Sequence, residues 1–451
     1  MTIGQEVIAL QAENAGLRAE NCSLRAELAA ALKRIAELEQ GVRQSPSFVK
    51  ANKPKKAGPK AQRRKRKPEH NRARRREVPT RIVVHRREQC PDCGCRLHGN
   101  SVARRRQVVD LPPPQSVEVT EHQVIKGWCP RCERWHTPKL NLGGQALGQG
   151  RLGARLVSLI AYLRTVLRMT VRAICEYLET VHQVRISVGE VVEVLARVGH
   201  KMQPSLGSLR EQLRASTVVH ADETGWRQDG RNGYVWAFGT SGREAVRYYE
   251  RHESRAGAIV RRVLGTRFEG ILSSDFYGGY NEHKGRHQRC WAHLLRDLHA
   301  LKEEHPGNTE VLAWAQAVRG LHDEAQAFLA ASASPSQAGR EAQYSVLVQR
   351  LQPLGLAYAR EKAHPCQALA KRLLRHQDEL FQFVRVAGLP ADNNLAERSL
   401  RPVVVTRKIS GGTRSQRGSD VRMALASLFG TWQARGLNPF EQCFQSLGQS
   451  P

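Results

Sequence analysis

The stretch from residue 216 to residue 280 limits the fold of this 451-residue chain more than any other feature. Val218 and Val219 start a buried strand in STVVHADETGWR, and further strands are predicted in NGYVWAFGTS and EAVRYYE. A helix is predicted at SRAGAIVRRVLG, and FEGILSSDFYGGY supplies another strand, which ends in Asp275. The order strand, strand, strand, helix, strand predicts one α/β unit.

This order is the opening of an RNase H-like fold, in which the first and fourth strands are neighbours in the sheet. Asp222, which we expect near the end of the first strand, and Asp275 would then lie side by side. Two carboxylates so placed repel each other unless a divalent cation lies between them. A two-metal phosphoryl-transfer site usually needs a third carboxylate, on a helix against the same sheet edge.

The segment PADNNLAERSLR, residues 390–401, is the candidate for that helix. We expect Asp392 to be its N-cap and Pro402 to end it. Glu397 lies in its middle and is predicted to be the third metal ligand, completing a site for two Mg²⁺ ions with Asp222 and Asp275.

Three neighbours of Glu397 can share its side of the helix: Asn393, Asn394 and Arg401. Asn393 and Asn394 precede it by four and three residues, and we expect them to orient it. Arg398 and Arg401 are predicted to contact DNA phosphates. These assignments rest on helical spacing alone.

Other residues compete for these roles. Glu223 follows Asp222 on the strand and should point to the opposite face, so it is the main alternative ligand. A second metal site could be formed by His283, His287, Cys290 and His293. We favour instead a core position for Cys290 and Trp291, with His293 and Arg296 lining the DNA side. For three aromatic residues, stacking on an exposed base and core packing are equally open: Trp226, Tyr277 and Tyr280.

Residues 3–38 repeat in sevens, with apolar residues at the d positions and at most of the a positions. Asn14 and Asn21 at position a favour a dimer in one register. Opposite charges face each other at g and e of a parallel dimer, in the pairs Glu13 with Arg18 and Glu20 with Arg25. We therefore predict a coiled coil that joins two or more copies. The alternative is an amphipathic helix packed on the chain's own domain.

Residues 43–76 hold 15 Lys or Arg and one acid, about half of the net charge of +29. Prolines interrupt this stretch, so we predict a disordered basic arm that neutralises DNA phosphates through residues such as Lys65 and Arg66. An anionic membrane surface is a weaker candidate partner, and a solvated linker is the bland alternative. No run approaches the roughly 18 apolar residues of a membrane span, and a signal peptide is not evident. We expect a cytoplasmic, nucleoid-associated protein.

Two CxxC pairs predict one structural zinc ion bound by four thiolates, from Cys90, Cys93, Cys129 and Cys132. Strands are expected between the pairs, in RRRQVVDLP and VEVTEHQVIKGW, which would give a zinc ribbon. Cys95 is a substitute ligand or, more plausibly, a bystander. Further on, residues 152–199 predict three helices, two short ones after a longer one, with Ser187 as an N-cap. That pattern suits a DNA-binding helix-turn-helix, and an ordinary helical linker domain is the alternative.

Four blocks of the chain resemble the signature blocks of the Insertion Sequence 66 family of bacterial transposases: HADETGWR, SSDFYGGYN, CWAHLLRDL and DNNLAERSLRP. The order of parts is also similar to that family. The resemblance implies that Asp222, Asp275 and Glu397 form a DDE triad, with a mostly helical insertion between the last two. It also implies accessory proteins encoded by the same element. The stretch ISGGTRSQRGSD departs from many relatives, which carry an aromatic-containing stretch at this place.

The sequence thus predicts a multidomain α+β protein with these parts: a coiled coil at 1–40, a basic linker at 41–79, a zinc module at 80–140, a helical DNA-binding region at 150–203, an RNase H-like catalytic domain at 210–435 with a helical insertion at about 300–388, and a tail at 436–451. Two rivals remain for the function. One is an inactive DNA-binding regulator, and the other is a nuclease of the same fold that cleaves DNA without joining it.

Overall fold

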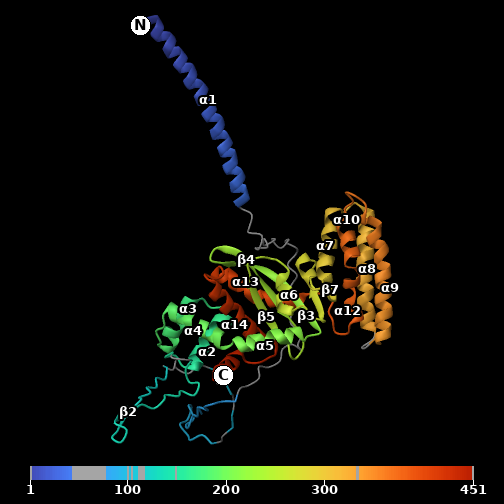
Figure 1. Cartoon of the computed structure of the whole chain (residues 1–451). Helices are drawn as coiled ribbons and strands as arrows, with labels where there is room; N and C mark the ends of the chain where they lie inside the picture. Colours follow the sequence, from blue (N-terminus) through green and yellow to red (C-terminus); the bar gives the residue numbers. More distant parts are fainter. Residues whose placement is uncertain are drawn as a thin grey trace. The chain divides into compact units, whose positions relative to one another are not determined.

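The computed structural model describes residues 3–42, 78–98, 101–102, 105–109, 117–147, 150–331 and 335–448. The chain separates into two compact units, residues 1–111 and 112–451 (Figure 1). The predicted basic arm, with Lys65 and Arg66, lies almost wholly outside the described residues. None of the described helices is long and apolar enough to cross a membrane.

The first unit contains one long helix, α1 (Ile3–Val42), which covers the predicted heptads. Its described leucines are half or more exposed: Leu17, Leu24, Leu28 and Leu32. An apolar stripe of this kind is buried only when another surface covers it. Cys22 on the same helix is exposed, as expected.

The second unit begins with a short hairpin of β1 (Gly127–Cys129) and β2 (Arg134–His136), paired antiparallel. The strand expected in RRRQVVDLP is wrong as far as it is described, because residues 105–109 are irregular. The strand expected in VEVTEHQVIKGW is confirmed only at its end, where Gly127 and Trp128 belong to β1, since residues 117–126 are irregular. A β-branched run forms a strand only where a second strand offers its hydrogen bonds.

Four helices precede the large sheet: α2 (Ala154–Thr165), α3 (Val171–His182), α4 (Val188–Lys201) and α5 (Gln203–Arg214). The three predicted helices are confirmed, although the first is not the longest, and α5 was not predicted. The Ser187 side chain caps α4 by accepting from the Glu190 N–H at 3.1 Å, as predicted. These helices share one hydrophobic cluster with the sheet and with α14 (Gln416–Ala434).

The sheet has five strands in the order β5-β4-β3-β6-β7. The strands are β3 (Val218–Gln228), β4 (Arg231–Gly239), β5 (Arg247–His252), β6 (Ile271–Ser274) and β7 (His287–Arg289). The first and fourth strands, β3 and β6, are parallel neighbours, as expected. The expected end of β3 near Asp222 is wrong, since β3 runs to Gln228 as a ribbon paired with β4.

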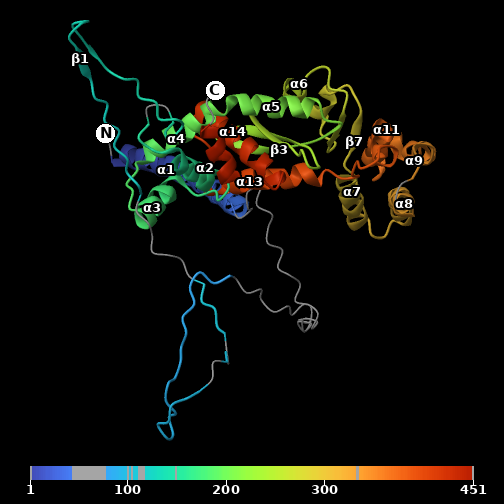
Figure 2. The ribbon, with the colours of Figure 1, turned by 90° about the horizontal axis from the view of Figure 1, so that it is seen from below.

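Helices cover both faces of the sheet (Figure 2). Helix α5 and α6 (Ala258–Leu264) lie on one face, where Trp236 and Tyr280 are buried. Helix α13 (Asn394–Ser410) lies on the other, where Leu400 and Val403 pack on β3 and β4.

Two predictions are corrected here, one for the end of α13 and one for the C-terminal segment. Helix α13 does not end at Pro402 but continues to Ser410 and is closed by Gly411 in the left-handed region. Proline removes one N–H donor, and the surrounding contacts of α13 tolerate that loss. The expected C-terminal tail contains α15 (Pro439–Gly448), which buries Cys443 and Leu447 against α2.

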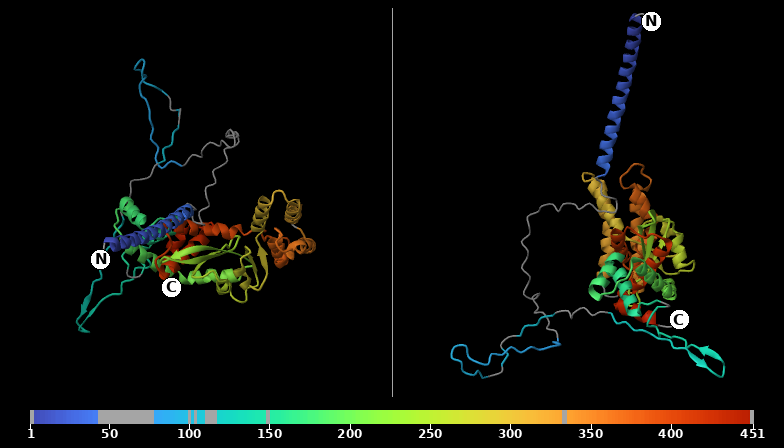
Figure 3. Two further views of the ribbon diagram at one scale, coloured as in Figure 1. Left: turned by 90° about the horizontal axis from the view of Figure 1, so that it is seen from above. Right: turned by 90° about the vertical axis from the view of Figure 1, so that its left-hand side faces the viewer.

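The predicted helical insertion is confirmed as helical. It consists of α7 (Trp291–Glu304), α8 (Thr309–Ala331), α9 (Gln337–Ala359), α10 (Gln367–Arg375), α11 (Gln377–Leu380) and α12 (Gln382–Arg385). These helices stand at the β7 end of the sheet (Figure 3) and form a hydrophobic cluster of their own around Trp291, Trp314 and Phe381. The insertion therefore has its own core and is anchored where β7 leads into α7.

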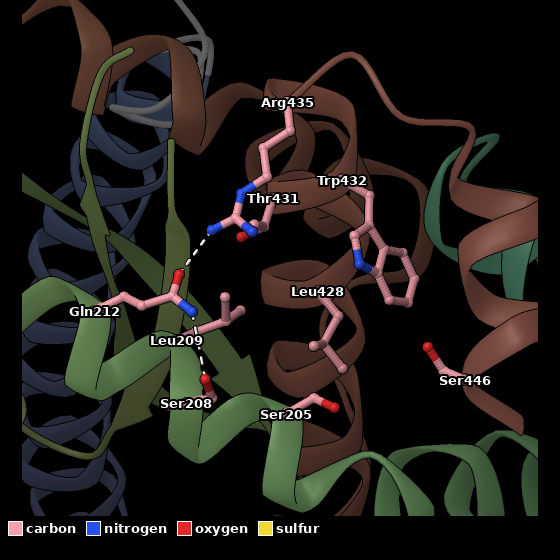
Figure 4. A pocket seen from close by; sticks show the side chains of 9 residues that line it. All are labelled: Ser205, Ser208, Leu209, Gln212, Leu428, Thr431, Trp432, Arg435 and Ser446. Carbon is pink, nitrogen blue, oxygen red and sulfur yellow. Dashed lines mark hydrogen bonds between the residues drawn. The ribbon is translucent and has the colours of Figure 1, made fainter. Parts of the chain in front are cut away.

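A pocket of about 220 Å³ opens between α5, α14 and α15 (Figure 4). Arg435 donates to the Gln212 Oε1 at 2.7 Å and to the Ala245 carbonyl at 3.0 Å, and Gln212 in turn donates to Ser208. The pocket contains none of the predicted site residues, so the candidate site lies elsewhere.

Candidate functional site

Asp222 lies within β3, and Asp275 directly follows the neighbouring strand β6 at the same level of the sheet. The parallel pairing of β3 with β6 ends at His220 and Ser273. Asp222 follows His220 by two positions, and Asp275 follows Ser273 by two positions. The two aspartates are therefore at the same level along the chain direction of these strands. The fold thus brings the first two predicted carboxylates to one point of the sheet.

Asn393 fixes the start of α13 to this point. It is buried, and its Nδ2 donates to the Ala221 carbonyl at 2.7 Å, one residue before Asp222. Its Oδ1 lies 3.2 Å from the His220 Nδ1. Asn393 therefore joins the helix to β3: its side chain bonds Ala221 and His220, and its backbone carbonyl accepts from the Glu397 N–H at 3.3 Å. One turn later, α13 presents Glu397 on its first turn.

The N-terminus of α13 is one residue later than predicted. Asn393 is the N-cap, and Asp392 precedes it. The Asp392 carboxylate still accepts two hydrogen bonds from Asn394, from its backbone N–H at 3.0 Å and from its side-chain amide at 2.7 Å. Asn394 therefore helps to close the helix start and makes no hydrogen bond with Glu397.

The carboxylates influence one another electrostatically. Burial, and then the negative charges of Glu223, Asp275 and Glu397, together raise the pKa of Asp222 to about 8. No ion pair joins Asp222 or Asp275 to a Lys, Arg or His of the described chain. Carboxylate oxygens without a cationic partner are the ligands that Mg²⁺ prefers, so the residues fit a divalent cation. Their oxygens are spread more widely than 4.8 Å, because within the described residues only a cysteine–histidine group is that compact.

Glu223 lies on the opposite face, as the strand alternation predicts. Its side chain is 2% exposed and accepts hydrogen bonds from Arg255 and from the Tyr280 hydroxyl. Arg255 also stacks on the Tyr277 ring, 3.9 Å from its centre. Because Glu223 already has two donors, it is less suited than Asp222 to bind a metal.

Arg289 supports Asp275 from the next strand, a role that was not predicted from the sequence. Its buried guanidinium donates to the Asp275 carbonyl at 3.0 Å and to the Asn281 Oδ1 at 2.7 Å. On the insertion side it pairs with Glu379 of α11. The only signal was an arginine in a short buried strand, which does not reveal its partners.

Around the site, several open alternatives are resolved. Cys290 and Trp291 are buried, and so are Trp226 and Tyr280, which therefore pack in the core. The four residues considered as a second metal site form no compact ligand group among the residues described.

Three basic side chains border this region. His293 of α7 approaches Glu397, with 3.7 Å between Nε2 and Oε1. Arg398 and Arg401 are exposed on α13.

The second CxxC pair forms a compact ligand group. The Sγ atoms of Cys129 and Cys132 and a ring nitrogen of His136 lie within 4.8 Å of one another. Backbone and side-chain hydrogen bonds, first from Cys132, lower the pKa of the Cys129 thiol, which favours the thiolate that zinc binds. His136 was missed, although the spacing CxxCxxxH could have revealed it. We call these three residues the knuckle.

The first CxxC pair forms a similar turn in the other unit. The Cys90 N–H donates to the Cys95 carbonyl at 2.8 Å, and the Gly94 N–H donates to the Cys90 carbonyl at 2.9 Å. Hydrogen bonds with Asp92 and then Cys93 lower the pKa of the Cys90 thiol. Each pair is therefore locally arranged for metal binding.

Two family models match this sequence. Residues 149–421, more than half of the chain, match the transposase IS66 family. Residues 80–133 match the zinc-finger binding domain of transposase IS66. Together with the knuckle, the second match supports a structural zinc ion.

Curated relatives from Sinorhizobium fredii are more distant. The uncharacterized protein y4qI is 25% identical over 291 residues, which cover 58% of this chain and 53% of the relative. The uncharacterized protein y4jO is 29% identical over 178 residues, 40% of this chain and 52% of the relative. This chain thus spans about half the length of the curated relatives it matches, while the match over residues 149–421 identifies it as a member of the IS66 family of transposases.

Proposed function

We propose that this protein binds the ends of an insertion sequence and catalyses metal-dependent DNA strand cleavage and strand transfer with the DDE triad Asp222, Asp275 and Glu397. The observation that carries the proposal is the register of β3 and β6, which aligns the two aspartates beside the start of α13. The sheet order β5-β4-β3-β6-β7 supports the RNase H-like assignment.

In this mechanism the carboxylates of the triad hold two Mg²⁺ ions. Bound there, the metals would supply activation of water or a DNA 3′-hydroxyl and stabilisation of the leaving oxygen. The protein's part is to hold the three carboxylates in place: Arg289 supports the Asp275 backbone, and Asn393 joins α13 to β3. Glu223 is retained by Arg255 and Tyr280 on the other face. Arg398 and Arg401 are available to the DNA backbone.

The remaining parts would bring DNA and further copies to this centre. We propose that Cys90, Cys93, Cys129 and Cys132 bind one zinc ion in a ribbon, with His136 as a competing ligand. The helices from α2 to α4 would act as the helix-turn-helix, and the basic arm with Lys65 and Arg66 would hold phosphates. Residues 3–38 would form a homodimer or higher oligomer, since the leucines of α1 are exposed. Accessory proteins of the same element are further proposed partners.

The test uses purified full-length protein, a labelled element end, target DNA and Mg²⁺. Wild type should give cut and joined products, whereas Glu397→Gln should bind DNA and give neither. Glu304→Gln is the matched control, because Glu304 is exposed at the end of α7 and should behave as wild type.

Each other outcome has a definite meaning. Equal products from wild type and Glu397→Gln would show that the triad assignment is wrong. Cleavage without joined product would favour the nuclease. Binding without cleavage by wild type would favour the DNA-binding regulator.

A further inference from the structure

The chain that follows Glu397 is unusually one-sided in charge. Residues 398–419 hold six Lys or Arg and no Asp or Glu. Five of these cations are exposed: Arg417, which pairs with Glu193 at 3.0 Å, and the four residues Arg398, Arg401, Lys408 and Arg414. No acid within the described ranges lies at ion-pair distance from any of the four.

Some exposed arginines elsewhere in the structure have an acidic partner, whereas others, such as Arg155 and Arg375, have none among the described residues. Examples with their N–O distances are Arg151 with Glu190 at 3.1 Å, Arg185 with Glu179 at 2.7 Å and Arg319 with Asp323 at 3.4 Å. A solvated helix face would show the same mixture of signs. Cations that are left without acids next to a proposed phosphodiester site indicate a polyanionic partner.

Three of these four cations share one face of α13. Arg398, Arg401 and Lys408 are separated by three and seven residues, so they lie in a row along the helix. Val405 and Ile409 lie in the same row and are 41% and 47% exposed. The opposite face is buried against the sheet. The row therefore presents charge and aliphatic surface together on a rigid element.

The end of α13 is docked onto the tip of the β3–β4 hairpin. Thr413 donates its N–H to the Arg227 carbonyl at 3.0 Å and accepts from the Asp229 N–H at 2.9 Å. The Trp226 Nε1 donates to the Thr413 hydroxyl at 3.1 Å. Gly412 has φ of +110°, and a Cβ there would lie 2.0 Å from the Arg227 carbonyl oxygen. Only glycine allows this approach. The stretch ISGGTRS, which differs from that of many family members, therefore has a structural role here.

We propose that the α13 row, the turn at residues 411–414 and the hairpin tip at residues 227–231 form one track for the backbone of duplex DNA, which leads away from Glu397. This proposal rests on the proposed function, since it takes the scissile phosphate to lie at the triad. The tip adds the exposed Arg227 and Arg231 and one acid, Asp229.

The dimensions and chemistry of this α13 track fit a duplex. From Glu397 to Lys408 the helix advances about 16 Å at about 1.5 Å per residue, a distance over which a duplex presents several phosphates. Val405 and Ile409 can contact sugars or thymine methyl groups. Residues 398–414 hold no aromatic side chain, whereas surfaces for single strands usually stack bases on aromatic rings.

The test measures DNA affinity of the full chain against KCl concentration, without divalent metal so that no cleavage intervenes. The double variant Lys408→Glu, Arg414→Glu should bind a short duplex about 10-fold more weakly, and its logarithmic salt slope should fall by about two. The matched control is Lys371→Glu, Arg375→Glu on α10, which reverses two exposed cations without an acidic partner in the described structure. Its slope should equal that of wild type. Equal slopes for both double variants would overturn the track.

Further arms separate this proposal from the proposed function. A single strand of the same length should show a smaller difference between wild type and Lys408→Glu, Arg414→Glu than the duplex does, and a larger difference would refute the duplex assignment. Glu397→Gln should keep the wild-type salt slope. If the track variant loses duplex affinity while Glu397→Gln still cleaves, the triad fails and the track stands. If wild type cleaves and the track variant matches the control, the track fails and the triad stands.

Discussion

The carboxylate site and the knuckle are two candidate metal centres with opposite surroundings. The carboxylates lie at a sheet point braced by buried groups, since Asn393 and Arg289 hold the backbone around them. The knuckle residues Cys132 and His136 are exposed, and the hairpin that carries them has three residues in each strand. The comparison teaches that the first site is formed by the fold, whereas the second must form its own fold by binding metal.

Zinc removal gives the largest effect that separates the two centres. In zinc-finger peptides the metal supplies about 10–16 kcal/mol of apparent binding free energy, which is also folding free energy. A chelator should therefore speed amide exchange at residues 127–136 and leave the melting temperature of the α/β unit unchanged. Cys132→Ser should lose zinc, and Cys95→Ser is the control that should keep it. A lower melting temperature of the α/β unit after chelation would contradict the contrast.

A second prediction compares the two neighbouring acids Asp222 and Glu223, which lie on opposite faces of the sheet. Asp222→Asn should lower the cleavage rate by about 10³-fold or more, because a metal ligand is lost, which is a transition-state cost of about 4 kcal/mol. Glu223→Gln should lower it by less than about 10-fold, since Glu223 already binds Arg255 and Tyr280. Rates with saturating DNA check both. Equal losses would make Glu223 a ligand and the division between the faces wrong.

The ion pair between Arg289 and Glu379 on the insertion side predicts that the free energy of unfolding depends on pH. Burial alone would raise the pKa of Glu379, but hydrogen bonds from His376 and the charge of Arg289 lower it to about 2. A carboxyl with a lowered folded-state pKa stabilises the fold above its ordinary pKa of 4.5, and this stability is lost as the pH falls toward 2. Glu379→Gln should therefore cost about 3 kcal/mol at pH 7, where it leaves Arg289 buried without its acid.

Urea unfolding at pH 7 and pH 3 checks this prediction. The difference between wild type and Glu379→Gln should shrink at the lower pH. Glu361→Gln is the control, because Glu361 is exposed and lies beyond ion-pair distance of the described cations. A difference that does not change with pH would contradict the assigned ionisation of Glu379.

The smallest effect is expected at the hydrogen bond between Asn393 and the Ala221 carbonyl. Asn393→Ala removes the hydrogen bond to the Ala221 carbonyl and leaves that buried acceptor unsatisfied, at a cost of about 2 kcal/mol. The cleavage rate should fall as well, since Glu397 is then less firmly positioned. Asn394→Ala, whose side chain bonds only Asp392, should change either quantity less. Thermal melts and cleavage rates of both variants check this prediction. A larger loss for Asn394→Ala than for Asn393→Ala would show that this role of Asn393 is wrong.

Much of the α/β unit could be predicted from local patterns. Alternating apolar residues and turn signals identified the strands, and the neighbouring positions of β3 and β6 followed from their order. The helix ends were less predictable. Pro402 is a helix breaker in isolation, yet packing of Leu400 and Val403 on the sheet carries α13 through it.

The supporting groups of the site could not be predicted, for a different reason. Arg289 meets Glu379 across 90 positions, and Asn393 meets Ala221 across 172. Local periodicity does not contain such contacts, because they depend on how distant elements dock. His136 is the exception, since a histidine four residues after a CxxC pair is a local signal.

The most direct test of the central claim is to see where divalent metal binds. Crystals of the full-length protein with a cleaved element end, soaked in Mn²⁺, should show two anomalous peaks between the carboxylates of Asp222, Asp275 and Glu397. Crystals of Glu397→Gln should lose at least one of them. Peaks that contact Glu223 in place of Asp222, or a pattern unchanged in Glu397→Gln, would contradict the account.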